Sequence, residues 1–94
     1  MKTKTTIDYN VQIWQEGSQF IAHAMPLDVM SSGRSPDEAR DALDQAVELF
    51  IETAIEAGTF EEVLQDAGYL VGRDRLTSPP WVAFERHSMA LDYA

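Results

Sequence analysis

The alternation of apolar and polar residues near the start of the chain predicts a β-hairpin. Every second residue from position 7 to position 13 is apolar, namely Ile7, Tyr9, Val11 and Ile13. This period of two is typical of a strand with one buried and one solvated face. Residues 16–18, Glu-Gly-Ser, have the composition of a hairpin turn.

The returning strand is predicted over Gln19–Met25. Its alternation places Phe20, Ala22 and Ala24 on one face and Ile21, His23 and Met25 on the other. Pro26 ends the strand because proline has no backbone N–H to donate to the ladder. A short third strand is expected over residues 27–32, and Gly33 is expected to break it.

A long amphipathic helix is predicted from Ser35 to about Ala57. Ser35 stands at the N-cap, Pro36 at the first helical position and Glu38 at the third, which is a capping box with proline where its missing N–H costs nothing. Gly58 is the C-terminal stop signal. One stripe of the helix is apolar, with Ala39, Ala42, Leu43, Ala46, Phe50 and Ala54, and the opposite stripe is acidic, with Asp37, Asp41, Asp44, Glu48 and Glu52.

A second helix is predicted to start at once, with Thr59 as the N-cap of a further capping box and Gly68 as the stop. Its apolar face holds Val63, Leu64 and Ala67. A polar loop through residues 73–75 and a stiff Ser-Pro-Pro linker at 78–80 follow, and imperfect alternation from Trp81 to Tyr93 predicts a final strand.

The order of these elements is β-β-β-α-α-β, an α+β fold in which one antiparallel sheet carries the long helix on one face. We expect a single domain over 1–94, with a core over 5–71, a linker over 72–80 and a C-terminal strand or tail over 81–94. Hydrophobic residues make up 45% of the 94-residue chain, and nine of its residues are aromatic, which argues against wholesale disorder.

Charge is concentrated in one part of the chain. The net charge is −9, and residues 37–66 hold ten acids against a single base, Arg40, so that this segment accounts for all of it. The acids form either a solvated helix face or a landing surface for a cationic partner, which would raise the association rate more than the affinity. We expect partner binding on the helix stripe at Asp37, Asp41, Asp44 and Glu48. An acidic chain is a poor default binder of nucleic acid, because phosphate contacts dominate that affinity.

Two isoleucines interrupt the acidic stripe. Ile51 and Ile55 project close to it rather than to the apolar stripe, and they either pack against the second helix or lie at a subunit interface. Trp81 and Phe84, after the double proline, are candidate anchors of the same kind. The apolar tail could add to the sheet of its own subunit or reach that of a neighbour, so a homo-oligomer, a dimer or tetramer, is expected.

No pattern in the chain indicates catalysis, and we expect neither an enzyme nor a cofactor or metal. The two histidines, His23 and His87, lack the spacing of metal ligands, and no phosphate-binding loop or serine-nucleophile motif is present. The absence of cysteine rules out disulfides and thiolate metal sites. No apolar run approaches the length of a membrane span and no signal-peptide pattern opens the chain, so a cytoplasmic location is the simplest expectation.

The run from Pro26 to Ala39 resembles the signature region of the HicB family of antitoxins. There, a strand ends in a Pro/Asp-containing turn, a Ser-x-Gly stretch follows, and a Glu-Ala pair opens a long amphipathic helix. The matching segments are Tyr9–Ile13, the Gly17 turn, Phe20–Ala24, Ser31–Gly33, Ser35–Ala39, Ala42–Glu52, Gly58–Leu64, Ala67–Tyr69 and Pro79-Pro80.

The resemblance implies a degraded ribonuclease H-like domain that binds HicA, a small basic RNA-cleaving toxin, and masks its active site. The Pro-Gly often found after the second strand is missing, so residues 26–29 must turn differently. Many members carry a DNA-binding module, and we expect none here and no direct binding of DNA, since only residues 81–94 follow Pro80. Two alternatives are an orphan HicB-like homo-oligomeric scaffold without a toxin and a metal-dependent nuclease, for which the hairpin offers only Asp8 and Asp28.

Overall fold

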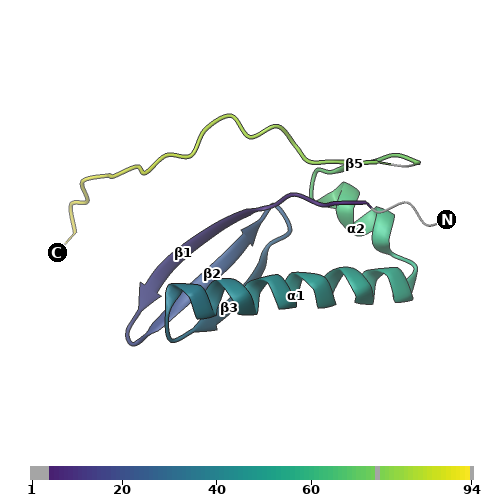
Figure 1. The fold of residues 1–94 in the computed structure, drawn as a ribbon. Helices are drawn as coiled ribbons and strands as arrows, with labels where there is room; N and C mark the ends of the chain where they lie inside the picture. The colour runs from purple at the N-terminus through teal and green to yellow at the C-terminus, as the bar shows by residue number, and fades with distance from the viewer. Residues whose placement is uncertain (1–4, 74, 94) are drawn as a thin grey trace.

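The computed structural model describes residues 5–73 and 75–93. Its elements, in chain order, are β1 (Asn10–Glu16), β2 (Gln19–Met25), β3 (Val29–Gly33), α1 (Pro36–Ala57), α2 (Phe60–Asp66), β4 (Leu70–Val71) and β5 (Leu76–Thr77). The first three strands form an antiparallel sheet in the order β1-β2-β3, and α1 packs against one face of it, mainly over β2 and β3 (Figure 1). The predicted α+β class is therefore confirmed.

The hairpin has the predicted turn and a shifted first strand. Glu16 pairs with Gln19 around the turn, and β2 has the predicted bounds. The β1 ladder begins only at Asn10, opposite Met25, because β2 ends before Pro26. Ile7 and Tyr9 precede the strand but still pack at the margin of the core. Val11, predicted on the buried face, is 39% exposed because α1 covers β1 only slightly.

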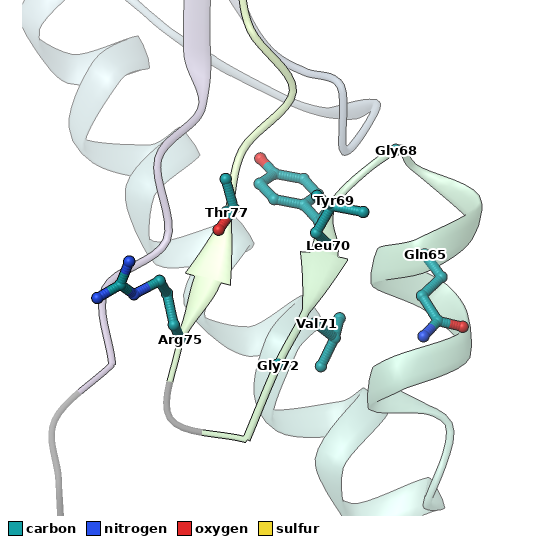
Figure 2. A pocket seen from close by; sticks show the side chains of 8 residues that line it. All are labelled: Gln65, Gly68, Tyr69, Leu70, Val71, Gly72, Arg75 and Thr77. Atoms are coloured by element: carbon teal, nitrogen blue, oxygen red, sulfur yellow. The ribbon is translucent and has the colours of Figure 1, made fainter.

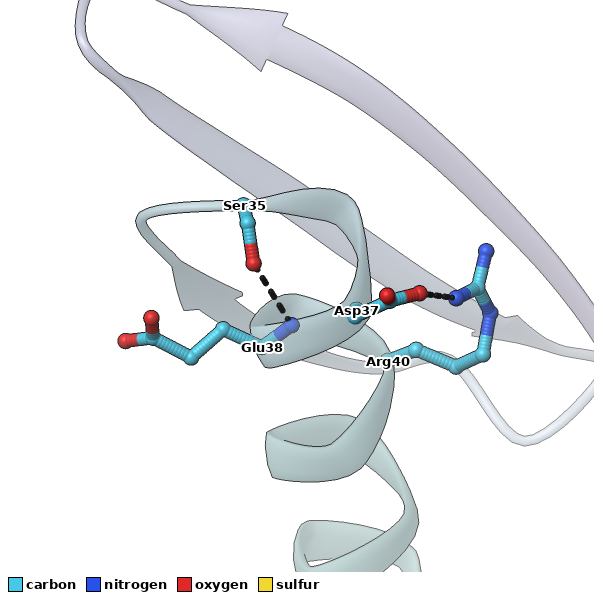
Figure 3. A network of polar contacts seen from close by, with 4 residues as sticks. All are labelled: Ser35, Asp37, Glu38 and Arg40. Atoms are coloured by element: carbon cyan, nitrogen blue, oxygen red, sulfur yellow. Dashed lines mark hydrogen bonds and ion pairs between the residues drawn. The ribbon is translucent and has the colours of Figure 1, made fainter.

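The start and the end of α1 are confirmed. Figure 3 shows Ser35 Oγ accepting the backbone N–H of Glu38 at 3.0 Å, with Pro36 as the first helical residue. Gly58 ends the helix in the left-handed conformation at φ +74°, where its N–H bonds to the Ile55 carbonyl at 3.1 Å. These local signals suffice to define a 22-residue helix.

The core lies between α1 and the sheet. Ala39, Leu43 and Val47 face the fully buried Ala22 and Ala24, and α2 and the segment after it add Leu64 and Tyr69. Small residues on β2 allow α1 to approach the sheet closely, and the largest fully buried side chains are those of Leu43 on α1, Leu64 on α2 and Tyr69 after α2. The predicted apolar stripe is largely confirmed, although Val47 rather than Ala42 or Ala46 is fully buried.

The start of α2 differs from the prediction. Thr59 makes no capping hydrogen bond to α2, and its hydroxyl instead donates to the Ala54 carbonyl at 3.5 Å. The backbone N–H of Thr59 donates to the same carbonyl at 2.9 Å, so both donors of Thr59 serve the C-terminal end of α1 rather than the start of α2. The predicted capping box is therefore wrong at this position.

The region after α2 also differs from the prediction. Leu70–Val71 and Leu76–Thr77 pair as a small antiparallel hairpin around the predicted polar loop, of which Asp74 lies outside the described residues. The final strand predicted from Trp81 is wrong, since residues 81–93 contain no strand. This tail runs extended on the side of the sheet away from α1 (Figure 1), and it has no neighbouring strand to bond to.

Candidate partner-binding surface

The acids of α1 and α2 are all exposed, and we call this set of residues the acidic surface. Its ten members are Asp37, Glu38, Asp41, Asp44, Glu48, Glu52, Glu56, Glu61, Glu62 and Asp66, and every one of them is exposed. The four predicted partner-binding residues lie within this set, all on α1. The amphipathic pattern places them away from the core because α1 buries the opposite stripe against the sheet.

Two of these carboxylates have internal partners. Asp37 accepts from Arg40 at 2.5 Å (Figure 3), and Asp44 accepts from the Tyr9 hydroxyl at 2.6 Å. Burial, followed by the bond to Asp44, raises the pKa of Tyr9 to about 12, so the hydroxyl stays protonated as a donor at neutral pH. These two acids are tied to the body, whereas Asp41 and Glu48 form no side-chain hydrogen bond with any described residue.

An apolar groove borders the acidic surface, and we call it the helix groove. It runs between α1 and α2, has a volume of about 430 Å³, and is lined by Ala46, Leu49, Phe50, Thr53, Ala54, Ala57, Thr59 and Val63. Leu49 is 64% exposed at its edge. Glu52 lies three residues beyond Leu49, and therefore on the adjoining part of the helix surface. Sequence reasoning missed this groove, although apolar or small residues recur at 46, 49, 50, 53 and 57.

The four residues predicted for an oligomer interface do not come together. Ile51 is half-buried and packs against the margin of the core. Ile55 is 57% exposed on α1, whereas Trp81 and Phe84 lie in the tail and are 39% and 73% exposed. Ile55 therefore belongs with the acidic surface, and the two aromatic residues belong to a different side of the molecule.

The side chains with catalytic potential do not form a constellation. His23 Nε2 lies 2.6 Å from Asp28 Oδ1, with Trp14 edge-on at 6.2 Å between ring centroids, and His87 contacts Glu85 at 2.7 Å. Asp8 precedes β1, and its backbone carbonyl accepts the Tyr69 hydroxyl. Within residues 5–73 and 75–93, no three histidine, aspartate or glutamate side chains gather as a metal site would require.

A further pocket of about 580 Å³ lies between α2 and the β4–β5 hairpin. Figure 2 shows its polar side chains diverging, with Gln65 on α2 and Arg75 pointing away from that helix. The ring of Tyr69 is buried beside it, and burial together with the nearby charge of Asp8 raises the pKa of this tyrosine. Convergent polar groups, which a catalytic pocket needs, are missing from its described lining.

Comparisons with protein-family models, with curated proteins and with solved structures find no match to this chain. The resemblance to HicB antitoxins therefore depends on the residues quoted for it. In the part of the chain that the structure describes, no helix combines the length and the apolar character needed to cross a bilayer.

Proposed function

We propose that this protein is an antitoxin that binds a small basic RNA-cleaving protein of the HicA type and masks its active site. The observation that carries the proposal is the acidic surface, in which ten exposed carboxylates on two consecutive helices stand beside an apolar groove. The resemblance of residues 26–39 to the HicB signature supports the same assignment.

The electrostatic argument follows from what an RNA-cleaving enzyme needs. Its active site must hold phosphates, and lysine and arginine side chains provide most of that affinity. An array of carboxylates along a helix presents negative charge to the same cations, so it competes with RNA for them. Fields of this kind raise association rates by roughly 10- to 1,000-fold at low salt.

The helix groove adds apolar contact area, which the carboxylates alone do not provide. An exposed ion pair contributes only about 0.2–1 kcal/mol, whereas apolar side chains seated in pockets dominate most interfaces. Leu49 and the lining of the helix groove offer such a pocket at the border of the acidic surface. Carboxylates would therefore guide a cationic partner to α1, and the helix groove would hold it there.

The body of the chain also fits the degraded ribonuclease H-like domain that we propose for it. Its β1-β2-β3 antiparallel sheet is followed by a long helix on one face, which supports this assignment. The carboxylate of Asp28 is engaged by His23 at 2.6 Å, so it would have to leave this contact to act as a metal ligand. This arrangement favours a binding role for the domain over metal-dependent cleavage.

Co-expression tests the function directly. Each small basic open reading frame found adjacent to this gene is induced with and without this chain in the same host. We expect growth arrest from the basic protein alone, rescue by this chain, and co-purification of the two at a fixed stoichiometry. Toxicity that this chain does not relieve would refute the antitoxin assignment, and a gene neighbourhood without a small basic partner would favour an orphan scaffold.

A further inference from the structure

The face of the sheet that α1 does not cover is apolar and open, and we call it the outer face. The β1-β2-β3 register places Trp14, Ile21, Met25 and Met30 on it, around the half-buried His23. Met25 is 43% exposed and Met30 is 53% exposed. Among the described residues, neither helix packs against this face. A sheet with α1 on one side only leaves such a surface to be covered by something else.

The tail, residues 81–93, is the second part of the molecule that leaves apolar side chains exposed. Trp81 at its start is 39% exposed, and the five other large apolar side chains, those of Val82, Phe84, Met89, Leu91 and Tyr93, are each at least 73% exposed. Thirteen extended residues span about 43 Å, whereas the seven-residue strands β1 and β2 span about 23 Å. The tail is therefore longer than the sheet of its own copy.

The dimensions of the chain show the same excess. The radius of gyration is 16.2 Å, and the longest extent is 60 Å. A compact domain of this length would have a radius of gyration of about 12 Å. The tail therefore extends along and past the body instead of closing over it (Figure 1).

A groove of about 650 Å³ joins these two surfaces. On the sheet side it is lined by residues that include Gln12, His23 and Met25, and on the tail side by Trp81 and Phe84. The first residues of the tail therefore lie beside the outer face. Residues 86–93 do not line this groove, and all of them are exposed.

Charge favours a second copy of this chain as the partner for these surfaces. The tail holds Glu85, Asp92, Arg86 and His87, so its charges nearly balance and offer little to a cationic protein. Two chains of net charge −9 repel each other, but contact through the outer faces keeps both acidic surfaces on the far sides of the two sheets. That separation exceeds the screening length of about 8 Å at physiological salt.

We propose that two copies form a twofold dimer in which the tail of each copy lies across the outer face of the other. Phe84 and Tyr93 bury about 150–250 Å² each when covered, so the two tails contribute about 600–1,000 Å² before Val82, Met89 and Leu91 are added. The sheets contribute a matching area. The total reaches the roughly 1,600 Å² of a standard stable interface. The exchange is reciprocal, so the assembly closes at two copies.

The mass of the purified chain, measured alone by light scattering, is the first test. One copy weighs 10.6 kDa, and we expect twice that mass. Phe84→Asp in the tail and Met30→Glu on the outer face should each halve it. Leu49→Glu, which changes an equally exposed apolar residue on α1, should not. A wild-type monomer, or a dimer that survives either of the first two substitutions, overturns the proposal.

A mixing experiment tests the exchange itself. In a mixed dimer, the Met30→Glu chain supplies an unchanged tail and the Phe84→Asp chain supplies an unchanged outer face. One of the two tail-to-sheet contacts is therefore kept. We expect the mixture to form a dimer at a concentration at which neither variant does alone. A tail that folds onto its own sheet predicts no such rescue, and its absence overturns the exchange. Both tests use this chain without any toxin, so they stand or fall separately from the antitoxin function.

Discussion

Gly33 sits where β3 meets the first turn of α1, and replacing it with alanine tests how closely the two pack. A Cβ atom added there would lie 2.6 Å from the backbone nitrogen of Ala39 and 2.8 Å from the carbonyl carbon of Glu38. Both are backbone atoms, so a rotamer change cannot relieve the clash. Because Ala39 is fully buried, moving α1 away from β3 would also loosen the core.

Overpacking of this kind costs about 1–3 kcal/mol, and we expect Gly33→Ala to reach the upper part of that range because the backbone must shift. The whole free energy of unfolding of a 94-residue domain is about 5–14 kcal/mol. Urea unfolding followed by far-UV circular dichroism should therefore show a midpoint lower by about 1–2 M.

Gly17→Ala is the matched control for this substitution. Nothing lies within 4 Å of a Cβ at Gly17, and only its φ of +60° opposes a side chain, which costs about 1–2 kcal/mol. We expect Gly33→Ala to lower the free energy of unfolding more than Gly17→Ala does. A loss below about 0.5 kcal/mol at Gly33, or a larger loss at Gly17, would refute the close packing of α1 on β3.

Three further predictions concern the core, the cap and two tyrosines. Leu43 is fully buried, so Leu43→Ala should lower the free energy of unfolding by about 3–5 kcal/mol in the same assay; a loss under 1 kcal/mol would contradict its place in the core. Ser35→Ala removes the acceptor of the Glu38 N–H and should cost about 1 kcal/mol, whereas Ser35→Asp, which keeps an acceptor, should cost much less. The pKa of Tyr9 is raised to about 12 and that of Tyr69 is also raised, so unfolded tyrosines ionise first and stability should fall as the pH rises from 10 to 12. Unfolding curves across this range should show a shallower fall for Tyr9→Phe and for Tyr69→Phe, and unchanged slopes would count against the buried environments.

The elements that could be predicted from the sequence are those whose signals are local. The turn at Gly17, the cap at Ser35 and the stop at Gly58 each act within a few residues, and all three are confirmed. The exposure of the acidic stripe follows from helical periodicity in the same way. Alternation also gave the correct bounds of β2.

The errors arise where a distant partner decides the outcome. The pattern from Trp81 to Tyr93 has the alternation of a strand, but a strand also needs a neighbour, and within one copy the tail has none. Leu70–Val71 gave no signal for a strand because a two-residue ladder depends on its pairing alone. Gly33 was expected to end the third strand and β3 does end there, but the close approach of α1, which leaves no room for a Cβ atom at this position, gave no local signal.

The candidate site was predicted only in part for a related reason. Charge is visible in the sequence, so the carboxylates of the acidic surface were identified correctly as exposed. The helix groove depends on how α2 folds back along α1, and that angle is set by the two-residue connection at Gly58 and Thr59. An apolar position such as Leu49 therefore gives no indication, from its own neighbours, that it borders a groove.

The most direct test of the acidic surface compares two variants with the same net charge. One carries Asp41→Asn, Glu48→Gln and Glu52→Gln, which leaves Asp37 and Asp44 with their internal partners. The other removes three acids outside the acidic surface through Glu16→Gln, Glu85→Gln and Asp92→Asn. Circular dichroism checks that both remain folded.

Stopped-flow mixing with the small basic protein that co-purifies with this chain in the co-expression test, at low and at physiological salt, gives the association rate for each variant. We predict that the α1 variant binds at least about tenfold more slowly than the wild type at low salt and loses most of the salt dependence, whereas the control variant stays within about twofold of the wild type. Equal association rates for the two variants would contradict the assignment of the acidic surface as the docking site.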